Sequence, residues 1–226
     1  MKTKFNVRHL ALGLMLVASP AANAAVSVTI DPAAPWQGFM NVFELPSNGG
    51  AYVFGSTWGT SDLVAVFSGA TLTVAPNTIG DPDPFWYIGG GAPGAAGNKI
   101  MDANMYVELN GGLGGQTISF SGIVTSNTLT SAHVTRAFIK DFAPDYSSFN
   151  QTSLILSGTG PFSISMSPIN DNARHVQYGF ETIGVNVWST DVAPYGNIQL
   201  TAIPETSGSA LASLAAGLIL MRRRRL

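Results

Sequence analysis

Short apolar segments, separated by glycine and proline, dominate the middle of the chain. They are rich in Val, Ile, Thr, Phe, Tyr and Trp, which favour strands, and each is shorter than a typical helix. Residues 131–142 are also expected to form a strand, because β-branched residues and Pro144 disfavour a helix there. We predict strands at residues 26–30, 39–45, 51–54, 63–67, 71–75, 85–88, 105–109, 117–124, 134–141, 153–156, 162–166, 175–181, 185–190 and 197–202.

Two of these segments alternate clearly between apolar and polar residues. Residues 103–109 read Ala-Asn-Met-Tyr-Val-Glu-Leu, and residues 176–181 read Val-Gln-Tyr-Gly-Phe-Glu. A period of two places one set on a buried face and the other on a face that meets water or a partner. Asn110-Gly111 follows the first segment and is a strong signal for a hairpin turn.

Many short strands without interleaved helices predict an all-β fold, an antiparallel two-sheet β-sandwich of the jelly-roll type. We expect this sandwich at residues 25–203, preceded by a signal peptide at residues 1–24 and followed by a sorting or anchor tail with a short hydrophobic helix at residues 204–226. The glycine-rich stretch at 89–97 spells G-x-G-x-x-G. Because Pro93 opposes a helix start there, we interpret it as a surface loop rather than a dinucleotide site.

The first 24 residues have the pattern of a secretion signal. Basic residues at positions 2, 4 and 8 precede an apolar run at 10–17, and Pro20 and the triplet Ala22-Asn23-Ala24 follow. This order predicts export and cleavage after Ala24. The run is far below the roughly 20 residues of a membrane-spanning helix, which disfavours a permanent anchor.

The other end combines a short motif, an apolar run and a basic cluster. Pro204, Glu205 and Thr206 lead into the mostly apolar residues 207–221. As a helix this run would reach about 22 Å, against a hydrocarbon layer of about 30 Å. The four arginines that follow are expected to stay in the cytoplasm, which leaves the middle of the chain outside the membrane. They are Arg222, Arg223, Arg224 and Arg225.

This tail resembles the PEP-CTERM sorting tails of secreted proteins from Gram-negative bacteria. Pro204, Glu205, the apolar run and the arginine cluster carry the resemblance, whereas Thr206 stands where the family usually has a second proline. The resemblance implies transient insertion into the inner membrane, processing by an exosortase, and association with exopolysaccharide at the cell surface or in the extracellular matrix. A plain C-terminal membrane anchor is the alternative, and the sequence leaves open whether the tail is cut.

The charge of the middle segment differs from that of the whole chain. Residues 25–203 contain four Lys or Arg and twelve Asp or Glu, a formal charge of −8, whereas the whole chain has −2. Such a surface repels phosphate backbones, so nucleic-acid binding is not expected. The chain has no cysteine, which excludes thiol catalysis and Cys-ligated zinc.

Residues 134–202 resemble the galactose-binding-like jelly rolls that serve as carbohydrate-binding modules. The segments AFIKDF and HVQYGFETIGVNVW carry this resemblance, which implies a class of protein and no particular ligand.

A sugar-binding face is predicted at a hairpin over residues 175–190, with its turn at 182–184. In that register one outward face carries an aromatic ring among amide and carboxylate groups, which can stack on a sugar and bond its hydroxyls. The alternative is that the tryptophan closes the edge of the core, and Trp36, Trp58 or Trp86 could equally form such a platform. The predicted binding residues are His175, Gln177, Glu181, Asn186 and Trp188.

Clustered oxygen ligands make Ca²⁺ a candidate ion at three places. These are Asp81 with Asp83, Asp141 with Asp145, and the segment 170–172, although Asp-Pro pairs are also common turn starters. No metal, cofactor or catalytic residue is assigned, because the middle segment carries no G-x-S-x-G or H-E-x-x-H motif. The leading hypothesis is a non-enzymatic exported surface protein. A carbohydrate-binding module is the alternative, and a glycan-active enzyme is a third candidate.

The predicted topology has a direct test. A reporter protein inserted within residues 25–203 is expected to be active outside the cytoplasmic membrane, because the basic clusters at both ends resist translocation. Activity restricted to the interior of intact cells would contradict the prediction.

Overall fold

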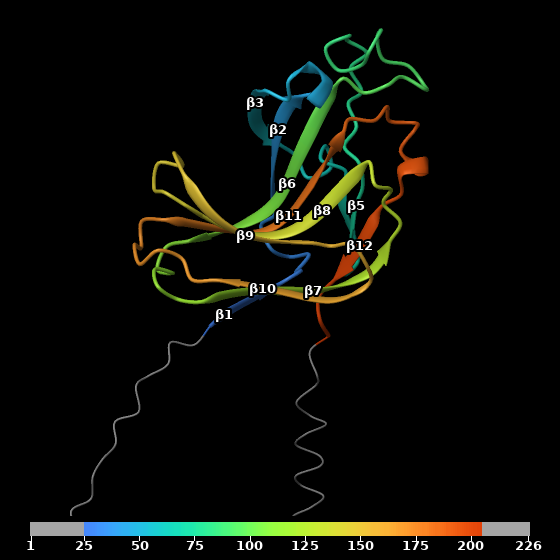
Figure 1. Ribbon diagram of the computed structural model, residues 1–226. Helices are drawn as coiled ribbons and strands as arrows, with labels where there is room; N and C mark the ends of the chain where they lie inside the picture. Colours follow the sequence, from blue (N-terminus) through green and yellow to red (C-terminus); the bar gives the residue numbers. More distant parts are fainter. Residues whose placement is uncertain (1–24, 205–226) are drawn as a thin grey trace, which may run out of the picture.

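The computed structural model describes residues 25–204, which form two β-sheets packed face to face. Figure 1 shows β1, β7 and β10 in the lower layer and β6, β8, β9 and β11 in the upper layer. The predicted all-β two-sheet sandwich is therefore confirmed. The predicted signal peptide, the apolar run and the arginine cluster lie outside the described residues.

Sheet A has the strand order β1-β7-β12-β5-β4, and β10 also pairs with β7. All its described pairs are antiparallel except β1 with β7, so the antiparallel prediction is wrong for that pair. The strands between β1 and β7 in the chain supply the crossover that a parallel pair requires. The strands are β1 (Val26–Thr29), β4 (Ala65–Ser68), β5 (Thr71–Val74), β7 (Ile118–Asn127), β10 (Gly160–Met166) and β12 (Ile198–Thr201).

Sheet B has the order β3-β2-β6-β11-β8-β9, and all its pairs are antiparallel. Its long central strands β6 and β11 pair over eleven positions, from His175 opposite Asn110 to Val185 opposite Ile100. The strands are β2 (Gln37–Glu44), β3 (Tyr52–Trp58), β6 (Lys99–Asn110), β8 (His133–Phe142), β9 (Phe149–Ile155) and β11 (His175–Val185). Two short 3₁₀ helices, η1 (Pro46–Asn48) and η2 (Ala193–Tyr195), lie in connections.

The core lies between the sheets and is built by the apolar set of each alternating strand. On β11, Val176, Tyr178 and Phe180 are buried, as their alternation predicts. The ring centroid of Phe180 lies 5.3 Å from that of Phe120 on β7 and 6.0 Å from that of Phe162 on β10. These aromatic contacts join the two sheets.

Three local predictions are wrong. Residues 85–88 form turns rather than a strand, because the Asp83 carboxylate accepts a hydrogen bond from the Phe85 amide at 2.7 Å. Asn110-Gly111 does not close a hairpin, since β6 belongs to sheet B and β7 to sheet A. Residues 185–190 leave sheet B after Val185, so the predicted last strand of the 175–190 hairpin is absent there.

Two other predictions are confirmed. Residues 131–142 supply a strand, β8, and the glycine-rich stretch is a loop in which Gly89 and Gly94 have positive φ angles of 81° and 84°.

Within residues 25–204 the structure contains no helix with the length and apolarity needed to cross a membrane.

Removal of the Phe180 ring from the contact between the sheets should destabilise the protein. We expect Phe180→Ala to lower the free energy of unfolding by about 3–5 kcal/mol, because it leaves a cavity between the sheets. Val66→Ala, at a half-exposed position on β4, is the control and should change it by less than about 0.5 kcal/mol. Urea denaturation measures both, and equal effects would contradict the assigned core.

Candidate functional site

The outward face of sheet B carries a groove with a volume of about 680 Å³. All six strands of the sheet and the turn between β8 and β9 contribute to its walls. The lining residues are Gln37, Phe39, Asn41, Phe43, Tyr52, Thr57, Asp102, Asn104, Tyr106, Glu108, Lys140, Phe142, Tyr146, Phe149, Gln151, Gln177 and Glu181.

The groove is built by the polar set of the same alternating strands that form the core. In the register of the sheet, Gln177 on β11 lies between Glu108 on β6 and Lys140 on β8. Glu181 lies between Asn104 and Arg136. Because strand side chains alternate between faces, these residues point away from sheet A and form the groove floor.

Charged groups in the groove centre are paired with one another. The Lys140 ammonium donates to Asn104 Oδ1 at 2.6 Å and lies 3.4 Å from Glu181 Oε2, while Arg136 donates to Glu181 Oε1 at 3.2 Å. Lys140, Asn104 and Glu181 are almost as buried as the core. The pairing is physically required, because an unpaired charge at this depth would cost several kcal/mol, on the order of 3–5.

Glycine at position 179 lies within this part of the groove floor. On β11 it lies midway between Gln177, which pairs with Lys140 on β8, and Glu181. A Cβ atom there would clash with the carbonyl oxygen of Met105 on β6. The absence of a side chain therefore allows β6 and β11 to pair closely at this position.

Asp102 extends the polar network toward β2. Its two carboxylate oxygens accept hydrogen bonds from Asn41 Nδ2 at 3.1 Å and Asn104 Nδ2 at 2.8 Å. Burial raises the pKa of Asp102, and the nearby Glu181 carboxylate raises it further, while Lys140 and the two amides oppose the rise.

Glu108 organises the end of the groove formed by the β8–β9 turn. It accepts hydrogen bonds from the Tyr146 hydroxyl at 2.9 and 3.1 Å and from Gln177 Nε2 at 2.8 Å. His175 Nδ1 lies 3.3 Å from the same carboxylate, and its ring stacks on Tyr146 with centroids 4.3 Å apart. These contacts hold Tyr146 in a left-handed conformation, with φ of 58°, which non-glycine residues rarely adopt.

The same contacts perturb the ionisation of Tyr146. Desolvation by burial, together with the hydrogen bond and negative charge of Glu108, raises the pKa of Tyr146 to about 12. The phenol therefore stays protonated at neutral pH and keeps donating to Glu108.

Aromatic rings gather at the two ends of the groove. At one end the rings of Phe43 and Tyr52 meet edge to face, with centroids 5.5 Å apart. At the other end Phe142 lies 5.6 Å from Tyr146 and 5.0 Å from Phe149. Phe43 pairs with position 100 of β6. Phe142 pairs with His175, which in turn pairs with position 110 of β6. These two positions of β6 are about 33 Å apart along the strand, and so are the two ends of the groove.

Three of the five predicted binding residues lie together at this site. Gln177 and Glu181 line the groove, and His175 lies against its Tyr146 wall. The predicted hairpin is wrong, however, because β11 continues through 182–184 as one strand. Position 184 is a glycine because a Cβ there would clash with the ring of His133, so it marks close packing and not a turn.

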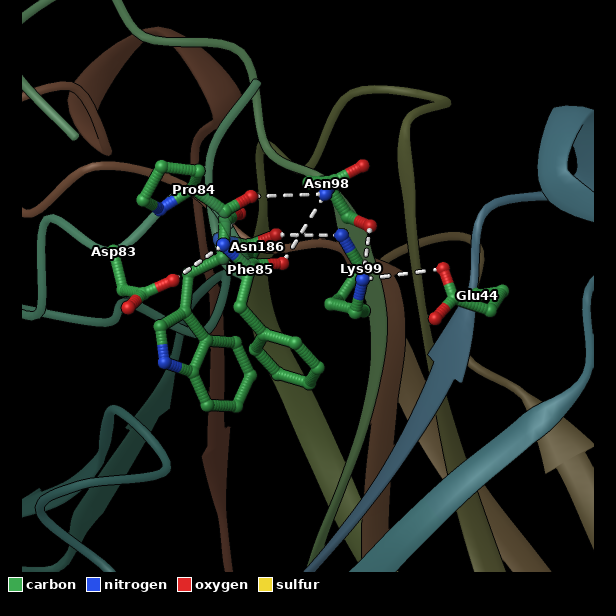
Figure 2. A network of polar contacts seen from close by, with 8 residues as sticks. Glu44, Asp83, Pro84, Phe85, Asn98, Lys99 and Asn186 are labelled. Carbon is green, nitrogen blue, oxygen red and sulfur yellow. Dashed lines mark hydrogen bonds and ion pairs between the residues drawn. The ribbon is translucent and has the colours of Figure 1, made fainter. Parts of the chain in front are cut away.

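Asn186 and Trp188 belong to a different part of the molecule. Asn186 is buried and donates to the Trp86 carbonyl at 2.9 Å, while its side-chain oxygen accepts from the Lys99 amide at 3.0 Å. Figure 2 shows Asn186 in this network beside Lys99, whose ammonium pairs with Glu44 at 3.1 Å. The Trp188 ring packs against Tyr87 at 5.2 Å, which agrees with the alternative that it closes the core.

Most of the groove residues could not be predicted from the sequence. Asn104, Tyr106 and Glu108 are the polar set of a segment whose alternation was recognised, but nothing in that pattern showed that it lies beside β11. Lys140 and Tyr146 carried no signal of their own, because their roles depend on pairing across strands distant in sequence.

The carboxylates considered for Ca²⁺ accept hydrogen bonds from groups of the protein. Asp81 and Asp83 accept from the backbone amides two residues ahead, at 2.9 and 2.7 Å. Asp141 is buried and pairs with Arg174 at 2.7 Å, while Asp145 accepts from Ser147. In the 170–172 segment, Asp171 accepts from Ala173. Among residues 25–204, no three His, Cys, Asp or Glu side chains group in a way that could hold a metal ion.

Comparison with known proteins identifies no family for the chain. No family model matches it, and no curated protein matches it. The structure of TmCBM61 in complex with β-1,4-galactotriose has a TM-score of 0.33 and 10% identity, covering 74% of this chain and 84% of that one. The CBM22-2 xylan-binding domain from Paenibacillus barcinonensis Xyn10C has a TM-score of 0.27 and 12% identity, covering 61% and 86%. At these scores the likenesses carry no argument about function.

The link between Glu108 and Tyr146 can be measured. Glu108→Gln is expected to lower the pKa of Tyr146 from about 12 toward its ordinary value of 10, because it removes a negative charge beside the phenol. Titration of the tyrosine Cζ signals by NMR measures this. Tyr178 is the internal reference, since burial in the core raises its pKa and Glu108 does not contribute. An unchanged Tyr146 pKa would contradict the assigned contact.

Proposed function

We propose that the protein binds a neutral polysaccharide in the groove of sheet B and does not transform it chemically. The observation that carries the proposal is the composition of the groove. Aromatic rings lie at both ends, and the charged groups between them already have partners within the protein. Such a surface offers stacking and neutral hydrogen bonding to a ligand.

The aromatic ends support an extended ligand. Rings at groove ends can stack on the apolar C–H faces of sugars, and a separation of about 33 Å suits a chain of several sugar units. Tyr52, Tyr146 and Phe149 are more than 45% exposed, so their rings are available to a ligand. Large exposed aromatic groups on one concave surface are typical of binding sites.

Neutral polar groups supply the remaining contacts. Gln37, Gln151 and Tyr106 line the groove and carry neutral polar groups. An amide offers both donors and acceptors, as does a phenol, which matches the hydroxyl groups of a sugar. Burial of these groups beneath a ligand without new hydrogen bonds would be costly.

The charge distribution disfavours acidic polysaccharides. Among the groove-lining residues, Asp102, Glu108 and Glu181 face a single cation, Lys140. Residues 25–203 as a whole have a formal charge of −8. A polyuronate would therefore meet repulsion both on approach and in the groove.

The carboxylate contacts support a binding role over hydrolysis. A glycosidase needs one carboxyl group as acid and a second as nucleophile or base at the scissile bond. Here Asp102 is occupied by Asn41 and Asn104, Glu108 by Tyr146 and Gln177, and Glu181 by Arg136 and Lys140. These carboxylates fix the shape of the groove.

We place this binding activity outside the cytoplasm, at the cell surface or in the extracellular matrix. The proposal combines the N-terminal secretion signal with the PEP-CTERM-like tail and its exosortase, both of which rest on sequence alone. We also assign the sandwich to the jelly-roll type. Strands remote in sequence pair in both sheets, β2 with β6 and β5 with β12, which supports that assignment.

Affinity electrophoresis of the full-length chain in gels containing a soluble polysaccharide tests the proposal. We expect retardation by at least one neutral polymer in a panel of galactan, xylan, mannan and β-glucan, and none by alginate or polygalacturonate. Tyr146→Ala and Phe149→Ala should each weaken the retarding interaction about tenfold, which corresponds to about 1.4 kcal/mol, because each removes one aromatic ring on which a sugar can stack.

Two variants control this experiment. Phe85→Ala removes an exposed ring from a loop outside the groove and should leave retardation unchanged. Trp188→Phe should also leave it unchanged, because that ring packs on Tyr87. Loss of retardation in Trp188→Phe but not in Tyr146→Ala would move the site away from the groove. Release of reducing sugar from the retarding polymer would overturn the non-enzymatic assignment.

A further inference from the structure

Strand β9 forms an open edge of sheet B. It pairs with β8 on one side, and on its other side no described strand pairs with it. Both of its faces are accessible: Phe149 and Ile155 are 51% and 53% exposed on the groove face, and Leu154 is 41% exposed on the opposite face. Strand β10 of sheet A contacts β9, but it leaves these side chains on both faces of β9 accessible.

The sequence of β9 contains none of the features that protect sheet edges. Its seven residues, Phe-Asn-Gln-Thr-Ser-Leu-Ile, include no charged residue, no proline and no glycine. Charges, proline, bulges and short length are the usual protections of an edge strand. An unprotected edge of this kind is a template for a further strand.

Other sheet edges in the described region are protected. In sheet A, β1 and β4 have only four residues each, and β10 contains Pro161. In sheet B, β3 contains Gly55, and its pairing with β2 shifts register after Val42. Only β9 among these edges combines length, exposure and a regular register.

We propose that two copies of this chain pair through β9 as antiparallel strands, with Thr152 opposite Thr152 of the second copy. In this register Phe149 lies opposite Ile155 and Gln151 opposite Ser153 on the groove face, so the strand is complementary to itself. A second copy is the occupant that this register favours, because the strand is complementary to itself and carries no charge that would face its own copy. Two copies can approach only where like charges do not oppose them.

The pairing joins two sheets B into one sheet of twelve strands. Phe149 and Gln151 belong to both β9 and the groove wall, so the grooves of the two copies become neighbours across the joint. If the proposed function holds, one polysaccharide chain can occupy both grooves, which raises its apparent affinity through effective concentration. The pairing itself does not depend on the proposed function.

Cysteine cross-linking tests the pairing, because the natural chain has no cysteine. Opposed residues of antiparallel strands have Cα atoms about 4.5–5.5 Å apart, within the range of a disulfide. We expect full-length Thr152→Cys, treated with diamide as the two-electron oxidant, to form a covalent dimer. Asn150→Cys places the cysteine on the same face of the strand. In the proposed register the two introduced cysteines would be four residues apart, about 13 Å along the strand. This variant should cross-link at least tenfold more slowly.

Two further changes separate pairing through β9 from chance collision. Ile155→Lys, added to Thr152→Cys, places a charge on the edge and should slow cross-linking at least tenfold. Val66→Lys places the same charge on the edge strand β4, at an equally exposed position, and should leave the rate unchanged. Absence of the Thr152→Cys dimer, equal rates for Thr152→Cys and Asn150→Cys, or insensitivity to Ile155→Lys would overturn the proposal. The proposed function is tested separately, by the retardation of the unmodified chain in polysaccharide gels, so failure of one proposal can be distinguished from failure of the other.

Discussion

Mutual pairing of buried polar groups on the outward face of sheet B is the constraint on which the site depends. The outer face of an antiparallel sheet is usually solvated, yet Lys140, Asn104 and Glu181 are nearly as buried as core residues. Burial of that kind is tolerated only when each charge has a partner. Lys140 and Glu181 are partners to each other, and the Lys140 ammonium also donates a hydrogen bond to Asn104 across β11.

Sequence pattern was sufficient to predict the class of fold and one face of the central strands. Val176, Tyr178 and Phe180 are inward because they alternate with polar residues, and local pattern is enough to show it. The local pattern also indicated a turn at Gly184, and this prediction is wrong because β11 continues through that residue. Its actual role is to accept the ring of His133 from the neighbouring strand, and this contact is not visible in the local sequence.

The candidate site illustrates the same limit. Gln177 and Glu181 were assigned to a common face, but their partners come from β6 and β8, which lie far away in sequence. Trp188 has the large aromatic ring typical of a sugar platform, but in the folded chain it packs on Tyr87. The rings that line the groove, such as Tyr146, lie in turns or strands where only the register of the folded sheet brings them together. Composition identifies the types of group required, and topology decides which of them meet.

The central claim is that a neutral glycan occupies the groove and contacts its aromatic walls. NMR spectra of the chain carrying ¹³C-labelled tyrosine rings test it directly when a retarding neutral polysaccharide is added. We predict shifts for Tyr52, Tyr106 and Tyr146, which line the groove, and no change for Tyr87 and Tyr178, which are buried in the core. Shifts confined to residues outside the groove, or no shift at saturating glycan, would contradict the account.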